Sequence, residues 1–121
     1  MSFVRKRFQA FGYALKGLKH AFLSEAHFRI HSFAAAVVIT AGFFFHITPT
    51  EWLVVTLCIV SVMAAELFNT VAEELVNLLH PESGKKAGKI KDMAAAAVLI
   101  CAAGSFISGL LIFIPYLKEC F

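Results

Sequence analysis

The stretch "TEWLVVTLCIVSVMAAELFNTVAEELVNLL", residues 50–79, contains neither proline nor glycine and predicts one unbroken helix. From Trp52 to Ala65 it is apolar enough to lie in a membrane, whereas the remainder carries glutamate and asparagine side chains. A charged side chain at the centre of a bilayer costs about 2.5–3.5 kcal/mol on insertion scales. Such side chains on a membrane helix therefore predict a functional site.

The composition is that of a membrane protein. Of the 121 residues, 60% are hydrophobic and 16% are charged, whereas soluble domains average about 45–50% and about 25%. No linker, repeat or low-complexity tract divides the chain, which predicts a single membrane-embedded domain over residues 1–121. Two of the three cysteines, Cys58 and Cys101, lie in apolar runs and are expected to pack as small apolar residues.

The hydrophobic pattern predicts an all-α fold with one surface helix and three membrane spans. Residues 1–28 are expected to form an amphipathic interfacial helix, because apolar side chains recur every three or four residues and basic side chains fall largely outside that stripe. The spans are expected at residues 30–47, 50–79 and 91–117. In the last span, small residues repeat every fourth position, a pattern that allows close helix packing in lipid: Ala97, Cys101, Ser105 and Gly109.

The distribution of basic residues predicts the orientation. All Lys and Arg except Lys118 lie before the first span or between the second and the third. By the positive-inside rule, the N-terminus and the second loop face the cytoplasm. We therefore expect a multi-pass membrane protein, with its polar site on the cytoplasmic side and its surface helix against anionic lipid headgroups.

Four polar side chains of the second span share one helical face. At about 100° per residue they fall within a sector of about 80°: Glu66, Asn69, Glu73 and Asn77. The apolar stripe of the surface helix, extended by one step, leads to a further carboxylate, Glu25. Mg²⁺ typically binds one or two carboxylates together with phosphate oxygens. With the Lys-rich loop at the same membrane level, these residues predict a site for a metal and a phosphorylated anion.

Three segments, "KGLKHAFLSEAHFRIH" (16–31), "AELFNTVAEELVN" (65–77) and "KIKDMAAAAVLI" (89–100), resemble the bacterial diacylglycerol kinase and undecaprenol kinase family. The likeness extends over nearly the whole chain, and no P-loop or protein-kinase motif is present. The resemblance implies a homotrimeric lipid kinase. Such an enzyme transfers the γ-phosphoryl group of ATP to the hydroxyl of a membrane lipid alcohol, either diacylglycerol or undecaprenol.

The same resemblance implies roles for individual residues. It makes Glu66 the catalytic base and Asn69 a polar residue of the active site, and it makes Glu25 and Glu73 ligands of the Mg²⁺ that accompanies ATP. It assigns contacts with the nucleotide to six residues: Tyr13, Glu25, Glu73, Glu82, Lys91 and Asp92.

The chain departs from the family pattern at three positions. Asn77 stands where many members carry Asp, and Ser83 with Gly84 replaces a more usual aromatic–His pair in the nucleotide loop.

His27 and His31 lie four residues apart, a spacing that could bind a metal, but their place at the membrane boundary favours interfacial positioning. Both lipid alcohols present a primary hydroxyl on an apolar body, so the choice between them stays open.

The alternative function is a small proton-coupled multidrug-type transporter, because a lone membrane glutamate can couple protons to a cation. Three expected spans rather than four, and carboxylates gathered towards a Lys-rich loop, favour the kinase. A scaffolding protein that acts through its basic helix would leave the membrane carboxylates unexplained. No nucleic-acid partner is expected.

Overall fold

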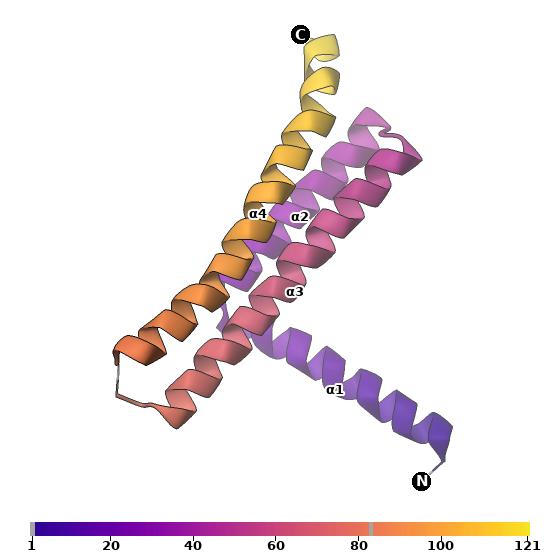
Figure 1. Cartoon of the computed structure of the whole chain (residues 1–121). Coiled ribbons are helices and arrows are strands. Elements are labelled where there is room, and N and C mark those ends of the chain that lie inside the picture. Colours follow the sequence, from indigo (N-terminus) through magenta and orange to yellow (C-terminus); the bar gives the residue numbers. More distant parts are fainter. Residues whose placement is uncertain (1, 83) are drawn as a thin grey trace.

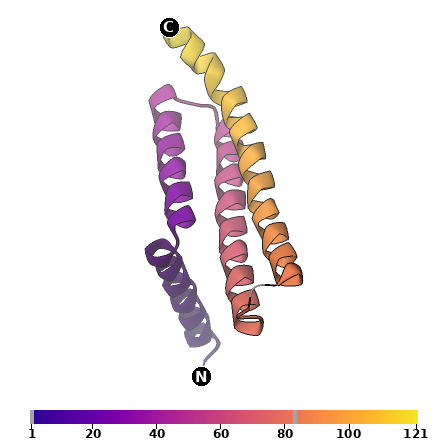
Figure 2. The same ribbon diagram turned by 90° about the vertical axis from the view of Figure 1, so that its left-hand side faces the viewer.

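The computed structural model of the protein describes residues 2–82 and 84–121, so the departure at Ser83 lies outside the described residues. These residues form four helices: α1 (Phe3–Ser24), α2 (Ala26–Phe45), α3 (Pro49–Leu79) and α4 (Lys85–Cys120). The helices α2, α3 and α4 lie side by side as a bundle, whereas α1 diverges from it (Figures 1 and 2). The predicted all-α fold is confirmed.

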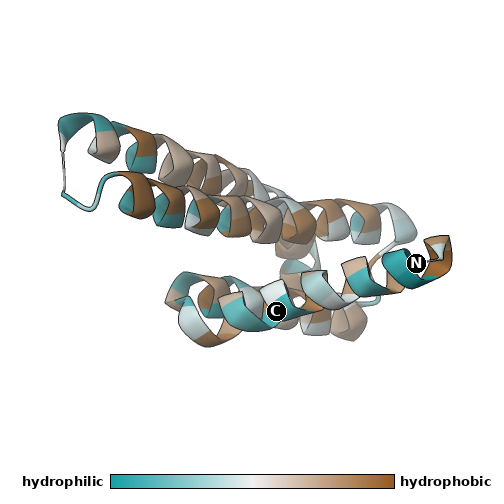
Figure 3. Ribbon diagram, turned by 90° about the horizontal axis from the view of Figure 1, so that it is seen from below, coloured by the Kyte–Doolittle hydropathy of each residue, from teal (hydrophilic) through white to brown (hydrophobic). Residues whose placement is uncertain are grey.

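The three bundle helices are long and apolar enough to cross a membrane, with 20, 31 and 36 residues. At about 1.5 Å per residue, α3 and α4 exceed the hydrocarbon thickness of about 30 Å, so both extend past it. The N-terminus and the α3–α4 loop lie towards one end of the molecule, and the C-terminus and the α2–α3 turn towards the other (Figure 1). Hydrophilic residues gather at the α3–α4 loop and are interspersed along α1 (Figure 3). The protein is therefore a multi-pass membrane protein.

The surface helix ends earlier than the sequence predicted. Glu25 has extended backbone angles (φ −113°, ψ 111°) and separates α1 from α2. The helix expected over residues 1–28 therefore ends at Ser24. The helix α2 begins at Ala26, whereas the first span was expected to begin at residue 30. The guanidinium of Arg29 donates hydrogen bonds of 2.9 and 3.0 Å to two carbonyls in the last turn of α1. These bonds stabilise the break, because terminal carbonyls have no partner within their own helix.

The last helix begins six residues earlier than expected, at Lys85 rather than at residue 91, and continues to Cys120 rather than to residue 117. The limits expected from the sequence, residues 91 and 117, lie at or beside two charged residues, Lys91 and Lys118. Lysine is a good helix former, and a helix does not end where the hydrocarbon ends. The first turns of α4 therefore lie beyond the apolar part of the helix.

A polar cluster, here called the Glu51 cluster, joins the start of α3 to the end of α4; it consists of Thr48, Glu51 and Tyr116. The Thr48 N–H donates to the Glu51 carboxylate at 2.9 Å, and the Glu51 N–H donates to the Thr48 hydroxyl at 3.2 Å. The Tyr116 hydroxyl donates to the same carboxylate. This capping box with an added tyrosine starts α3 and fixes α4 beside it.

Below the Glu51 cluster lies the buried apolar core of the bundle, formed by Ile47, Val55 and Ile112. Gly42 allows a close approach between α2 and α3, because a Cβ there would lie 2.6 Å from the Trp52 ring. Trp52 therefore packs against α2. Most other large apolar side chains of the bundle are exposed on the outside of the single chain.

Candidate active site on α3

Glu66 lies in the middle of α3 and is the one buried charged residue in the described part of the chain, with 4% of its surface exposed. Its carboxylate Oε2 lies 3.6 Å from Nε2 of His31 on α2. That separation is longer than a hydrogen bond, so the contact is a close approach of two polar groups. Within residues 2–82 and 84–121, this is the only pairing of a carboxylate with a basic side chain at 4.0 Å or less.

One turn further along α3, Asn69 and Glu73 contact each other. The Asn69 amide Nδ2 donates to Glu73 Oε1 at 3.4 Å, which is a long hydrogen bond. The amide oxygen of Asn69 is buried and, within the described residues, has no hydrogen-bond partner. Most buried polar atoms have partners, and an unpaired one in a native fold calls for an explanation such as an absent ion or ligand.

The donor set of this face suits a hard divalent cation held together with phosphate. Two carboxylates and an unpartnered amide oxygen supply oxygen ligands, which Mg²⁺ prefers. Among the described residues, no group of three or more His, Cys, Asp or Glu side chains forms a complete metal site. This fits Mg²⁺, which is usually bound by one or two carboxylates plus substrate phosphates rather than by an all-protein cage.

Lys91 is linked to the loop end of the same α3 face. Its Nζ donates a 2.7 Å hydrogen bond to Oδ1 of Asn77, which joins the first turns of α4 to the last turns of α3. Asn77, one of the three departures expected from the resemblance, is thus the partner of a predicted nucleotide-binding residue. Asp92 and Glu82 are exposed at this end and form no hydrogen bond or ion pair with the described residues.

Two predicted site residues lie outside this assembly. Tyr13 on α1 is 67% exposed, and its ring lies under Nζ of Lys16 at 5.7 Å. Glu25 is half-buried at the break between α1 and α2, and no hydrogen bond or ion pair joins its carboxylate to α3 among the described residues. Within one chain, Asn69 therefore contacts Glu73, and Lys91 contacts Asn77 further along the same face of α3. Among the described residues, no hydrogen bond or ion pair joins the side chains of Tyr13, Glu25, Glu82 and Asp92 to that face.

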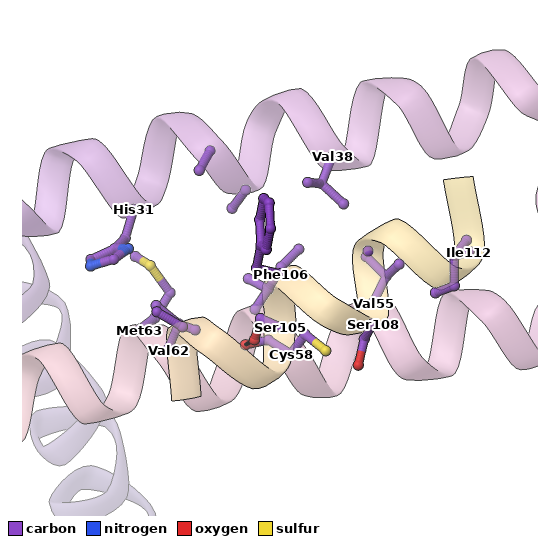
Figure 4. A pocket seen from close by; sticks show the side chains of 15 residues that line it. His31, Val38, Val55, Cys58, Val62, Met63, Ser105, Phe106, Ser108 and Ile112 are labelled. Atoms are coloured by element: carbon purple, nitrogen blue, oxygen red, sulfur yellow. Dashed lines mark hydrogen bonds between the residues drawn. The ribbon is translucent and has the colours of Figure 1, made fainter. Parts of the chain in front are cut away.

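His31 is the residue of this site that sequence reasoning missed. The sequence suggested interfacial positioning, whereas the structure brings the imidazole to Glu66 and to one end of a pocket of about 250 Å³ between α2, α3 and α4 (Figure 4). The pocket extends from His31 and Met63 past Phe106 to Ile112, and its walls are mostly apolar. The only sequence signal was a histidine at the start of an apolar run.

The fold and these residues define an integral-membrane protein with an acidic site partway along its helix bundle. The sequence model of prokaryotic diacylglycerol kinase matches residues 12–113, and the chain belongs to this family. It is 36% identical over 110 residues to undecaprenol kinase of Bacillus subtilis, which covers 91% of this chain and 89% of that protein. It is 36% identical over 103 residues to diacylglycerol kinase of Haemophilus influenzae, covering 84% of this chain and 87% of that protein.

A third relative, diacylglycerol kinase of Synechocystis sp., is 38% identical over 107 residues, which are 88% of this chain and 61% of that protein. The protein is therefore a lipid kinase, as the sequence resemblance implied. This membership does not favour the transporter alternative. The relatives include both undecaprenol and diacylglycerol kinases at similar identity, so they do not separate the two lipids.

Proposed function

We propose that this protein transfers the γ-phosphoryl group of ATP to the hydroxyl of a membrane lipid alcohol, diacylglycerol or undecaprenol, on the cytoplasmic side of the bacterial inner membrane. The observation that carries the proposal is the buried carboxylate of Glu66 within a helix that can span a membrane. A carboxylate in that environment is costly and is commonly functional. Its depth suits an acceptor hydroxyl that belongs to a lipid.

Glu66 is the general base of this reaction. The acceptor oxygen forms a bond to the γ-phosphorus, the bond from phosphorus to the bridging oxygen breaks, ADP leaves, and the hydroxyl proton passes to the Glu66 carboxylate. Glu66 precedes Glu73 by seven residues, which is about 10 Å along the helix. A base at that distance from the phosphate-binding end reaches a hydroxyl held in the membrane while the nucleotide stays near water.

Glu73 and Glu25 hold the Mg²⁺ that accompanies ATP, and the unpartnered Asn69 oxygen lies beside Glu73 as a further polar contact. When bound, the cation neutralises charge on the phosphates. Lys91 supplies a positive charge at the loop end of the site, and Asp92, Glu82 and Tyr13 complete the nucleotide contacts. The anchoring of Lys91 by Asn77 supports this placement, because it holds the ammonium at the end of α3 where the phosphates enter.

The active site is shared between chains of a homotrimer. Glu25 and Tyr13 do not contact the α3 face of their own chain, and the apolar outside of the bundle offers surface for close packing. Association with a neighbour would bring the missing residues to Glu73. Purified chains inactivated at Glu66 and chains inactivated at Glu25 should then recover activity when mixed before assembly. Co-assembled mixtures that stay inactive at every ratio would place the site within one chain.

The central test measures transfer of labelled γ-phosphate in lipid nanodiscs. The nanodiscs carry diacylglycerol, undecaprenol or neither lipid, and the labelled product is separated by thin-layer chromatography. A labelled lipid phosphate that depends on ATP, on Mg²⁺ and on Glu66 supports the proposal, and the preferred lipid names the substrate. Folded protein that labels neither lipid would overturn it.

A further inference from the structure

Among the described residues, one basic side chain from another helix lies within 4.0 Å of the Glu66 carboxylate. That neighbour is His31, whose side chain is 23% exposed while the Glu66 side chain is 5% exposed. A carboxylate removed from water is strongly destabilised unless a donor or an opposite charge faces it. The identity of the group that faces Glu66 therefore matters for its chemistry.

The other polar groups nearby are committed elsewhere. On α3 itself, the Asn69 amide donates to Glu73, and the Thr70 hydroxyl donates to the backbone carbonyl of Glu66 at 3.1 Å rather than to its carboxylate. Arg29, two residues before His31, is bound to backbone carbonyls at the end of α1.

On α4, the segment opposite Glu66 lies between two observed contacts. Lys91 bonds to Asn77, and the Ser105 hydroxyl bonds to the backbone carbonyl of Cys58. Residues 93–104 between them contain no charged side chain. Within the described part of the chain, His31 is thus the only side chain from another helix placed to satisfy the carboxylate of Glu66.

The imidazole of His31 can do this in either protonation state. A carboxylate is an acceptor only, so it favours the imidazole form with hydrogen on Nε2, whether the ring is neutral or protonated. The Nε2 to Oε2 separation of 3.6 Å needs to shorten by about 0.7 Å to reach the typical hydrogen-bond length of about 2.9 Å. Hydrogen bonds at catalytic groups are often long without substrate and shorten in the reactive complex.

We propose that His31 is a positioning residue: its Nε2–H holds the carboxylate of Glu66 in the orientation in which it accepts the proton of the lipid hydroxyl. The inference rests on the proposed role of Glu66 as the base. His31 lies at one end of the apolar pocket (Figure 4). It also lies beside Glu66, so it connects the two parts of the site that a lipid alcohol would occupy, the apolar pocket and the carboxylate.

The test compares His31→Leu with His31→Gln, which keeps an N–H donor of similar reach, and with His27→Leu as the matched control. His27 lies one turn earlier on α2 and is exposed. We expect His31→Leu to lower kcat about 10- to 100-fold while the KM for ATP stays near the wild-type value, as loss of a hydrogen bond to a charged group predicts. His31→Gln should restore most of kcat, and His27→Leu should resemble the wild type.

A double-mutant cycle separates positioning from a general effect on folding. In Glu66→Asp the carboxylate is withdrawn from His31, so adding His31→Leu should cost much less than it does beside Glu66. Equal losses in both backgrounds, an inactive His31→Gln enzyme, or a His31→Leu enzyme with wild-type kcat would each overturn the inference. If Glu66→Gln loses turnover while His31→Leu keeps it, the positioning role fails and the proposed function stands. If Glu66→Gln stays active, the base assignment fails, and with it this inference.

Discussion

Two glutamates on the same helix have opposite environments. Glu51, at the start of α3, accepts hydrogen bonds from the Thr48 backbone and the Tyr116 hydroxyl, and its own backbone N–H is bonded to Thr48. Glu66, fifteen residues later, is buried, and among the described residues its carboxylate has no hydrogen bond and one 3.6 Å contact, with His31. The first carboxylate has its partners within the protein, whereas the second retains unused acceptor capacity.

This difference separates a structural carboxylate from a functional one. A satisfied polar cluster fixes helices in one arrangement, and an incompletely satisfied buried group is expected where a ligand or substrate completes the site. Asn69 fits the same description as Glu66, because its buried amide oxygen also lacks a partner within the described residues. We therefore propose that the start of α3 holds the bundle together, whereas the part of α3 from Glu66 onward handles the substrate.

The sharpest test exchanges each glutamate for glutamine. We expect Glu66→Gln to remove most turnover, by about 10²–10⁴-fold, because an amide cannot accept the hydroxyl proton. Glu51→Gln keeps an oxygen acceptor for Thr48 and Tyr116 and should retain turnover close to the wild type. Single-turnover transfer of labelled phosphate in nanodiscs measures both. Comparable losses of turnover in the two variants would contradict the different roles of Glu51 and Glu66.

Glu73→Gln should weaken the apparent affinity for Mg²⁺ by at least about 10-fold, because the substitution removes a charged oxygen ligand beside Asn69. The matched control is Glu74→Gln, which changes the adjacent and exposed glutamate. Nucleotide binding followed during Mg²⁺ titration distinguishes the variants. If the Glu73→Gln curve overlays that of the wild type, the metal assignment is wrong.

Gly42 of α2 packs against Trp52 in the first turn of α3. We expect Gly42→Ala to lower the free energy of unfolding by about 1–3 kcal/mol, since the added Cβ would lie 2.6 Å from the Trp52 ring. Gly88→Ala is the matched control, because nothing lies within 4 Å of a Cβ at that position. Unfolding of purified protein in mixed micelles with increasing denaturant measures the change. Equal stability of the two variants would contradict the close approach of α2 and α3.

The smallest effect is expected for Asn77→Asp, which introduces the residue that the family resemblance implies at this position. The carboxylate would keep the contact that Asn77 now makes with Lys91 at 2.7 Å and would turn it into an ion pair. Such pairs at exposed positions contribute at most about 1 kcal/mol, so turnover and stability should change little. Steady-state assays and thermal unfolding check both quantities, and a large loss of activity would show that the site requires the neutral amide.

Much of this architecture follows from local pattern. The absence of proline and glycine over residues 50–79, the run of apolar residues and the helical repeat were enough to predict α3 and to place Glu66, Asn69 and Glu73 on one face. The cost of charge in lipid was enough to predict a functional site on that face, which stays a prediction. These properties depend on residues near one another in the chain, so the sequence alone determined them.

The tertiary structure decided which side chains of different helices meet. Three contacts show this, because each joins two helices. His31 contacts Glu66 over a separation of 35 positions, Lys91 contacts Asn77 over 14, and Tyr116 contacts Glu51 over 65. Such contacts depend on the rotation and the register of packed helices, which a local hydrophobic period leaves open. The break at Glu25 had the same origin, because Arg29 binds carbonyls of the preceding helix only once the chain has turned.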